Sequence, residues 1–135
     1  MFFEDELAST NDNGIIISAY QELLNEKVSG DEFCWGYYLR IENNSDNTIN
    51  LLGKNISIID SNGHSVSVNY EGFNGEAPTL EPGEVFEFED YATSKSSAVL
   101  RGSCKISTEK NRRIQDIEIP VLSLIANDNN RRIYN

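Results

Sequence analysis

Apolar and polar residues alternate most regularly between Glu32 and Glu42. The apolar positions of this stretch are Phe33, Trp35, Tyr37, Leu39 and Ile41. A period of two predicts a β-strand with one buried face, because successive side chains of a strand point to opposite sides. The aromatic side chains among them can each bury roughly 150–250 Å². The pattern therefore predicts a second sheet that packs over this strand.

Other segments show shorter runs of the same alternation, separated by turn-forming residues. They predict strands in the segments 14–20, 49–58, 66–68, 85–89, 100–106 and 117–121. About seven short antiparallel strands are typical of an all-β fold, the immunoglobulin-like or fibronectin type III-like sandwich of two antiparallel sheets. We expect residues 1–13 to form a mobile N-terminal arm, residues 14–125 the sandwich domain, and residues 126–135 a polar tail.

Three local signals refine this prediction. The parity of the apolar residues changes at Leu52-Gly53, which indicates a β-bulge. Asn62-Gly63 predicts a tight hairpin turn, because such turns require positive φ angles that Asn and Gly adopt readily. Pro120 lacks an N–H group, so we expect the last strand to lie at a sheet edge.

The composition fits a single domain, with 135 residues of which 39% are hydrophobic. No apolar run approaches the ~18 residues of a membrane-spanning helix. The first residues also lack the basic and apolar regions of a secretion signal. We therefore expect a cytoplasmic protein that does not contact a membrane.

The net charge of −11 is unevenly distributed along the chain. The first 100 residues carry 18 acidic and four basic side chains. Such a field repels nucleic acid, so we expect no nucleic-acid partner. Two interpretations of the acids stay open: they keep a small domain soluble, or they attract a basic partner.

The cysteines and the histidine do not indicate catalysis. Cys34 falls on the polar side of its strand and Cys104 on the apolar side of another, which disfavours a disulfide bond between them. Cys34 would need a base to act as a nucleophile, and the only histidine, His64, follows the hairpin turn. We expect two free thiols, no catalytic residues, and a protein that is not an enzyme.

The segment from Tyr70 to Glu84 interrupts the strand alternation and contains three glycines. It is also acidic, with Glu71, Glu76, Glu81 and Glu84 as the remaining candidate metal ligands. Solvated loop acids explain these carboxylates without a metal ion. We therefore expect no metal site and no cofactor.

We place the candidate binding site at the start of this loop. Its residues are Tyr70, Glu71, Gly72, Phe73, Asn74, Gly75 and Glu76. We expect the partner to be another protein that contacts Phe73 and Asn74 in an exposed loop. The alternative is a small phosphorylated ligand, a nucleotide or pyrophosphate, held through Gly72 and Gly75 with or without a bridging metal ion, because successive backbone amides bind anions.

Several motifs, taken in order, carry a family resemblance. They are L-R-I-E-N-N-S-D-N-T-I-N-L-L, I-I-D-S-N-G, E-G-F-N-G-E-A-P-T-L-E-P-G-E-V-F-E-F, L-R-G-S and I-E-I-P-V-L-S-L. Together they resemble the bacterial ApaG family over about residues 15–124. The resemblance implies a fibronectin-type sandwich, no established catalytic residues, and a partner-binding role like that of related domains in an F-box protein and a DNA-polymerase-delta-interacting protein. The sequence Lys54-Asn55-Ile56 departs from the Arg-His-Trp that the family usually shows.

Overall fold

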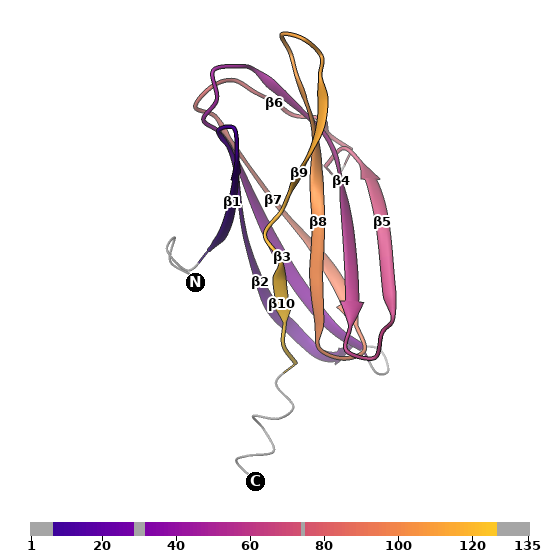
Figure 1. Ribbon diagram of the computed structural model, residues 1–135. Coiled ribbons are helices and arrows are strands. Elements are labelled where there is room, and N and C mark those ends of the chain that lie inside the picture. The colour runs from indigo at the N-terminus through magenta and orange to yellow at the C-terminus, as the bar shows by residue number, and fades with distance from the viewer. Residues whose placement is uncertain (1–6, 29–31, 74, 127–135) are drawn as a thin grey trace.

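The computed structural model describes residues 7–28, 32–73 and 75–126 (Figure 1). Over these ranges the chain forms ten strands and no helix. The strands are β1 (Ala8–Asp12), β2 (Ile15–Val28), β3 (Glu32–Asn43), β4 (Ile49–Asp60), β5 (Ser65–Glu71), β6 (Thr79–Leu80), β7 (Val85–Ser94), β8 (Ala98–Thr108), β9 (Ile114–Glu118) and β10 (Leu122–Leu124). The described part of the chain contains no helix long and apolar enough to cross a membrane.

The strands form two sheets that pack face to face. One sheet has the order β1-β2-β3-β7, and the other has the order β10-β8-β4-β5, with β6 paired to β4 and β9 paired to β8. Every pairing between these strands is antiparallel. Figure 1 shows β8, β4 and β5 in front of β2, β3 and β7. The predicted all-β sandwich of two antiparallel sheets is confirmed.

Strand β3 is the centre of the core, as its alternation predicts. Its five alternating apolar residues are at most 3% exposed, and the residues between them are only partly buried. The polar end of Trp35 is satisfied as well, because its Nε1–H donates a hydrogen bond of 2.9 Å to Ser94 Oγ. The facing sheet contributes the fully buried Leu51, Leu100 and Ile106.

The local signals in the sequence correspond to observed irregularities. The pairing of β4 with β8 shifts register between Leu51 and Gly53, which confirms the bulge. Gly63 has φ of 90° in the turn between β4 and β5, and the N–H of Asp60 donates to the carbonyl oxygen of His64 at 2.9 Å. Pro120 lies between β9 and β10, which each pair with β8 alone.

The structure differs from the expected strand boundaries at several places. The expected last strand 117–121 is divided, because β9 ends at Glu118 and β10 begins at Leu122, and the expected strand 85–89 continues as β7 to Ser94. Residues 8–12 of the expected arm form β1, an edge strand whose polar side chains gave no alternating signal. Strand β2 continues to Val28, because irregular pairing with β3 after Leu23 breaks the period of two without ending the strand. Residues 1–6 and 127–135 lie outside the described residues, so the expected arm and tail stay predictions there.

Candidate functional site

The two long sides of the sandwich differ. On one side, side chains bridge the sheets: Thr10 Oγ1 donates to the carbonyl oxygen of Glu118 at 2.7 Å, and Gln21 Nε2 donates to that of Ser123 at 2.8 Å. On the other side, β5 and β7 are the last strands of their sheets, and no further strand among the described residues pairs with them. The sandwich is therefore open between β5 and β7.

A groove of about 490 Å³ lies along this open side. We call it the edge groove; its apolar wall is formed by Ile56, Ile58, Val66, Val68, Tyr70 and Ala92. The charged side chains of Glu32, Asp60 and Lys95 border it, together with the imidazole of His64. A concave apolar surface with a few polar groups at its border is the usual form of a binding site.

The groove exists because β5 extends beyond the facing sheet. Val66 and Val68 pair in register with Ile58 and Ile56, so they belong to the inner face of their sheet. They are nevertheless 60% and 40% exposed. No strand of the described residues covers them, and an inner face without a cover is an apolar surface open to solvent.

A buried lysine lies against Tyr70, one of the residues that line the groove. Lys54 has a side chain only 1% exposed, and its Nζ lies 3.7 Å from Asp90 Oδ2 on β7. The same Nζ lies 4.0 Å from the centroid of the Tyr70 ring and 4.1 Å from that of Phe88, within the range of cation–π attraction. Burial lowers the pKa of Lys54, and the carboxylate of Asp90 opposes this shift.

The bulge at Gly53 explains why this lysine points inward. After the shift, Lys54 shares the inward side with Ile56, and on β7 Asp90 shares the inward side with Phe88. Sequence reasoning missed this pair, although a signal was present. Each strand carries one charged residue at a position where its parity requires an apolar one.

Tyr37 brings a buried hydroxyl to the same place. The residue is 3% exposed, and its hydroxyl oxygen has no hydrogen-bond partner among the described residues. Burial raises the pKa of this phenol, and the carboxylate of Asp90 raises it further.

The predicted site residues separate into three groups. Tyr70 lines the edge groove and covers Lys54. Glu71, Gly75 and Glu76 are exposed. The expectation that Phe73 is exposed is wrong: it is 1% exposed.

The burial of Phe73 has a direct cause. Its ring packs edge-on against Phe88 and Phe86 on β7, with centroids at 5.2 and 5.5 Å. This residue therefore anchors the loop to the core and is not available to a partner. Asn74, the other residue expected to contact the partner, lies outside the described residues.

Most amides of the glycine loop are already engaged. The N–H of Gly72 donates to the carbonyl oxygen of Leu52 at 2.7 Å, and Phe73 and Glu76 bond to each other through both of their amides. These three N–H groups do not point together at an open position where an anion could bind. No observation therefore favours the nucleotide or pyrophosphate alternative, which stays a prediction.

The candidate chemical groups are dispersed. Cys34 and Cys104 are free, and burial raises the pKa of the Cys104 thiol to about 12. His64 is largely exposed, with Nδ1 3.3 Å from Asp60 Oδ2. Within residues 7–28, 32–73 and 75–126, no three His, Cys, Asp or Glu side chains gather as metal ligands.

Fold and site together describe an immunoglobulin-like or fibronectin type III-like sandwich with an open apolar side. More specifically, the chain belongs to the ApaG family, because the model of the ApaG domain matches residues 24–108. It is 36% identical to Protein ApaG of Beijerinckia indica over 119 residues, which cover 86% of this chain and 91% of that protein. It is 33% identical to Protein ApaG of Brucella canis over 104 residues, covering 76% and 79% of the two chains.

Solved structures agree on the fold. A crystal structure of a protein from Bordetella pertussis named as ApaA superposes with a TM-score of 0.76 at 21% identity, covering 90% of this chain and 96% of that one. The C-terminal domain of wzt superposes with a TM-score of 0.52 at 13% identity, covering 90% and 77%. The resemblance to the ApaG family inferred from the motifs is confirmed.

Proposed function

We propose that this chain is a non-catalytic, protein-binding module, and that the edge groove is its binding surface. The observation that carries the proposal is the exposure of Val66, Val68 and Tyr91, at 60%, 40% and 67%, around one concave apolar surface. Apolar surface gathered in a hollow is stabilised when a partner covers it. Tyr70 is the predicted site residue that takes part in this surface.

The arrangement of reactive groups supports a non-catalytic role. Cys104 is fully buried with a raised pKa, so it holds its proton at neutral pH and is a poor nucleophile. His64 is engaged with Asp60 at the border of the groove, and neither cysteine lines that groove. A nucleophile and its base must lie within hydrogen-bond reach, and this pairing does not occur in the groove.

The proposal is tested by placing a charge in the groove. We expect Val66→Asp to abolish capture of partner proteins from a bacterial lysate, because a carboxylate on the groove wall would be desolvated by the partner. Val66 is 60% exposed, so the fold should change in stability by less than about 1 kcal/mol. The measurement is quantitative mass spectrometry of proteins bound to the immobilised domain.

Ile114→Asp is the matched control. Ile114 is 59% exposed and lies on β9, away from the groove. The Ile114→Asp variant should still capture every partner protein that the Val66→Asp variant loses. If the Val66→Asp domain, checked to be folded by thermal unfolding, captures the same proteins as the native chain, the groove is not the binding surface.

A further inference from the structure

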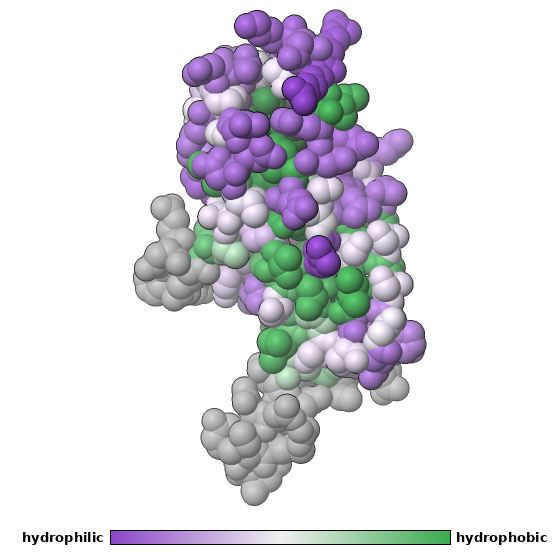
Figure 2. Space-filling view, in the orientation of Figure 1, coloured by the Kyte–Doolittle hydropathy of each residue, from purple (hydrophilic) through white to green (hydrophobic). Residues whose placement is uncertain are grey.

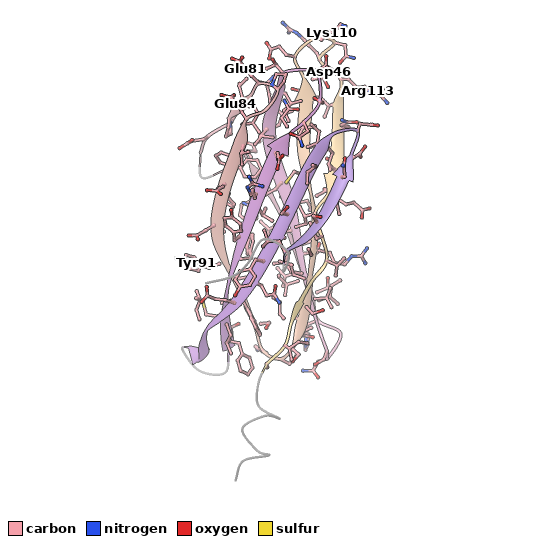
Figure 3. All side chains as sticks on the ribbon, turned by 90° about the vertical axis from the view of Figure 1, so that its left-hand side faces the viewer. Asp46, Glu81, Glu84, Tyr91, Lys110 and Arg113 are labelled. Atoms are coloured by element: carbon pink, nitrogen blue, oxygen red, sulfur yellow. The ribbon has the colours of Figure 1, made fainter. Side chains whose placement is uncertain are left out.

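Along the edge groove, strand β7 has backbone groups that pair with no other strand among the described residues. The N–H of Asn43 donates to the carbonyl oxygen of Glu84, which sets the hydrogen-bonded pairs between β3 and β7. In an antiparallel ladder the next residues alternate, so Glu89, Tyr91 and Thr93 direct their N–H and C=O groups away from β3. Figure 3 shows Tyr91 at this border of the sheet.

The hydrogen bond made by one of these backbone groups, the N–H of Tyr91, confirms that the group points away from β3. The N–H of Tyr91 donates to Asp90 Oδ1 of its own strand at 2.8 Å, not to β3. The Asp90 carboxylate therefore shields the edge at one position. The positions on either side, Glu89 and Thr93, are exposed.

The sandwich has room for one more strand beside β7. Strand β7 packs beneath β4, where Asp90 meets Lys54, whereas β5 extends beyond β7 with Val66 and Val68 uncovered. A strand added next to β7 would lie beneath β5 and cover these valines. A strand added next to β5 would extend that sheet further and leave its own inner face uncovered. The free edge of β7 is therefore the better pairing site.

The charges around this site favour a basic partner. Glu89 lies on the outer face of β7, and Glu32 and Asp60 border the groove, against Lys95 as the one exposed lysine or arginine in its lining. Lys54 is already paired with Asp90. Opposite charges on neighbouring strands contribute roughly 0.2–1 kcal/mol per pair, and the net charge of −11 speeds the approach of a cation.

Apolar surface elsewhere does not fit an added strand as well. Figure 2 shows apolar side chains over the lower half of the outer face of the six-stranded sheet, around β8 and β10. That face consists of side chains, because the backbone N–H and C=O groups of a strand lie in the plane of its sheet, so it offers no row of unpaired backbone groups. The edge groove combines such a row with an apolar hollow.

We propose that the edge groove binds an extended basic peptide, which pairs with the free edge of β7 as a fifth strand. Its apolar residues alternate with Lys or Arg: the apolar side chains face Val66 and Val68, and the cations face Glu89 on the outer side. From Glu89 to Ser94, the end of β7, the edge accommodates about six residues, or roughly 20 Å of strand. This inference rests on the proposed function of the groove, and it specifies the partner's chemistry and backbone conformation.

The first test compares three synthetic heptapeptides by fluorescence anisotropy with the full chain. One alternates Lys and Val, one has the same composition in blocks, and one alternates Glu and Val. We expect the alternating Lys–Val peptide to bind about tenfold more tightly than the block peptide, because only alternation separates apolar and charged faces. Equal binding of these two would show charge attraction alone and would overturn the proposal.

The second test removes one backbone donor. Thr93→Pro lacks the N–H that β7 directs outward, whereas Thr93→Ala keeps it and removes only side-chain atoms. The proline variant should bind the Lys–Val peptide about tenfold more weakly than the alanine variant, since one strand-pairing hydrogen bond is lost. Equal affinity of the two folded variants would overturn strand pairing at β7.

The third test needs no substitution near β7 and remains decisive if the proline variant fails to fold. Hydrogen exchange followed by NMR on the native chain should slow at the amides of Glu89 and Thr93 when the Lys–Val peptide binds. Slowed exchange at Ser67 and Asn69 instead would place the added strand on β5 and overturn the proposal. If the Val66→Asp variant still binds the Lys–Val peptide, the edge groove is not the binding surface. This outcome would overturn the proposed function, and it is distinct from a failure of strand pairing at β7.

Discussion

Replacing Asp90 by Asn isolates the charge of the buried pair. Asn has nearly the shape of Asp, and its amide oxygen can still accept the N–H of Tyr91, which Asp90 now accepts at 2.8 Å. Lys54 keeps the rings of Tyr70 and Phe88 around its Nζ. The substitution therefore leaves a buried ammonium group without its carboxylate.

The expected loss is about 2 kcal/mol of the free energy of unfolding at pH 7. Removing one partner of a fully buried pair costs roughly 3–5 kcal/mol. Here the side chain of Asp90 is 27% exposed, so solvent already screens part of the attraction. Cation–π contacts, worth roughly 0.5–2 kcal/mol, also remain for Lys54.

The loss must also shrink at alkaline pH. Lys54 can escape by losing its proton, which costs about 1.4 kcal/mol for each pH unit below its unfolded pKa of 10.5. The cost of deprotonating Lys54 is an upper limit on the stability that the variant can lose. This limit is about 5 kcal/mol at pH 7 and about 1.4 kcal/mol at pH 9.5. Because the folded pKa is lowered, the unfolded chain binds more protons in this window, and stability from this group rises with pH.

Urea unfolding, followed by the fluorescence of the buried Trp35, measures both values. The Lys54→Met background is the control, because Asp90→Asn should cost less than about 0.5 kcal/mol once the ammonium is absent. A loss below about 0.5 kcal/mol at pH 7 would refute the reasoning. A loss of free energy of unfolding that is as large at pH 9.5 as at pH 7 would also refute it. A loss that persists in the Lys54→Met background would do the same.

Two further predictions concern the core. The pKa of Cys104 is raised from 9.0 to about 12 by burial, so its stabilising effect is complete below pH 9 and is lost as the pH rises toward 12. The native chain should lose about 1 kcal/mol between pH 8 and pH 10 that Cys104→Ala does not lose in urea unfolding; parallel curves would contradict this. Phe73→Ala should lower the free energy of unfolding by roughly 3–5 kcal/mol in the same assay, because the ring is fully buried, and a loss below about 1 kcal/mol would mean that the ring is exposed.

The strands of the core could be predicted because they are buried on one face. Alternation in β3, the phase change at Gly53 and the turn at Gly63 each reflect a local geometric requirement, so each is visible in a few residues. Strand β1 gave no such signal, since an edge strand of exposed polar residues is held by backbone hydrogen bonds. Its existence depends on β2 lying beside it.

The edge groove could not be predicted in the same way. Val66 and Val68 alternate like core residues, and only the order of strands in both sheets reveals that nothing covers them. Phe73 gave the opposite error: in a polar loop rich in glycine it resembles an exposed contact residue, yet β7 supplies two rings that enclose it. Whether an apolar side chain is core or surface depends on distant parts of the chain.

The two free edges of the open side are protected against self-association by different means. Strand β7 carries the acids Glu87 and Glu89, which discourage pairing with the equally acidic edge of a second copy. Residues 65–70 of β5 contain no charge and no proline, and they pair with β4 without a bulge. Two such edges would pair readily, but each chain carries a charge of −11, which opposes the approach of a second copy. If the edge groove binds a basic peptide as proposed, the same acids that attract this peptide also repel a second, like-charged copy of the chain.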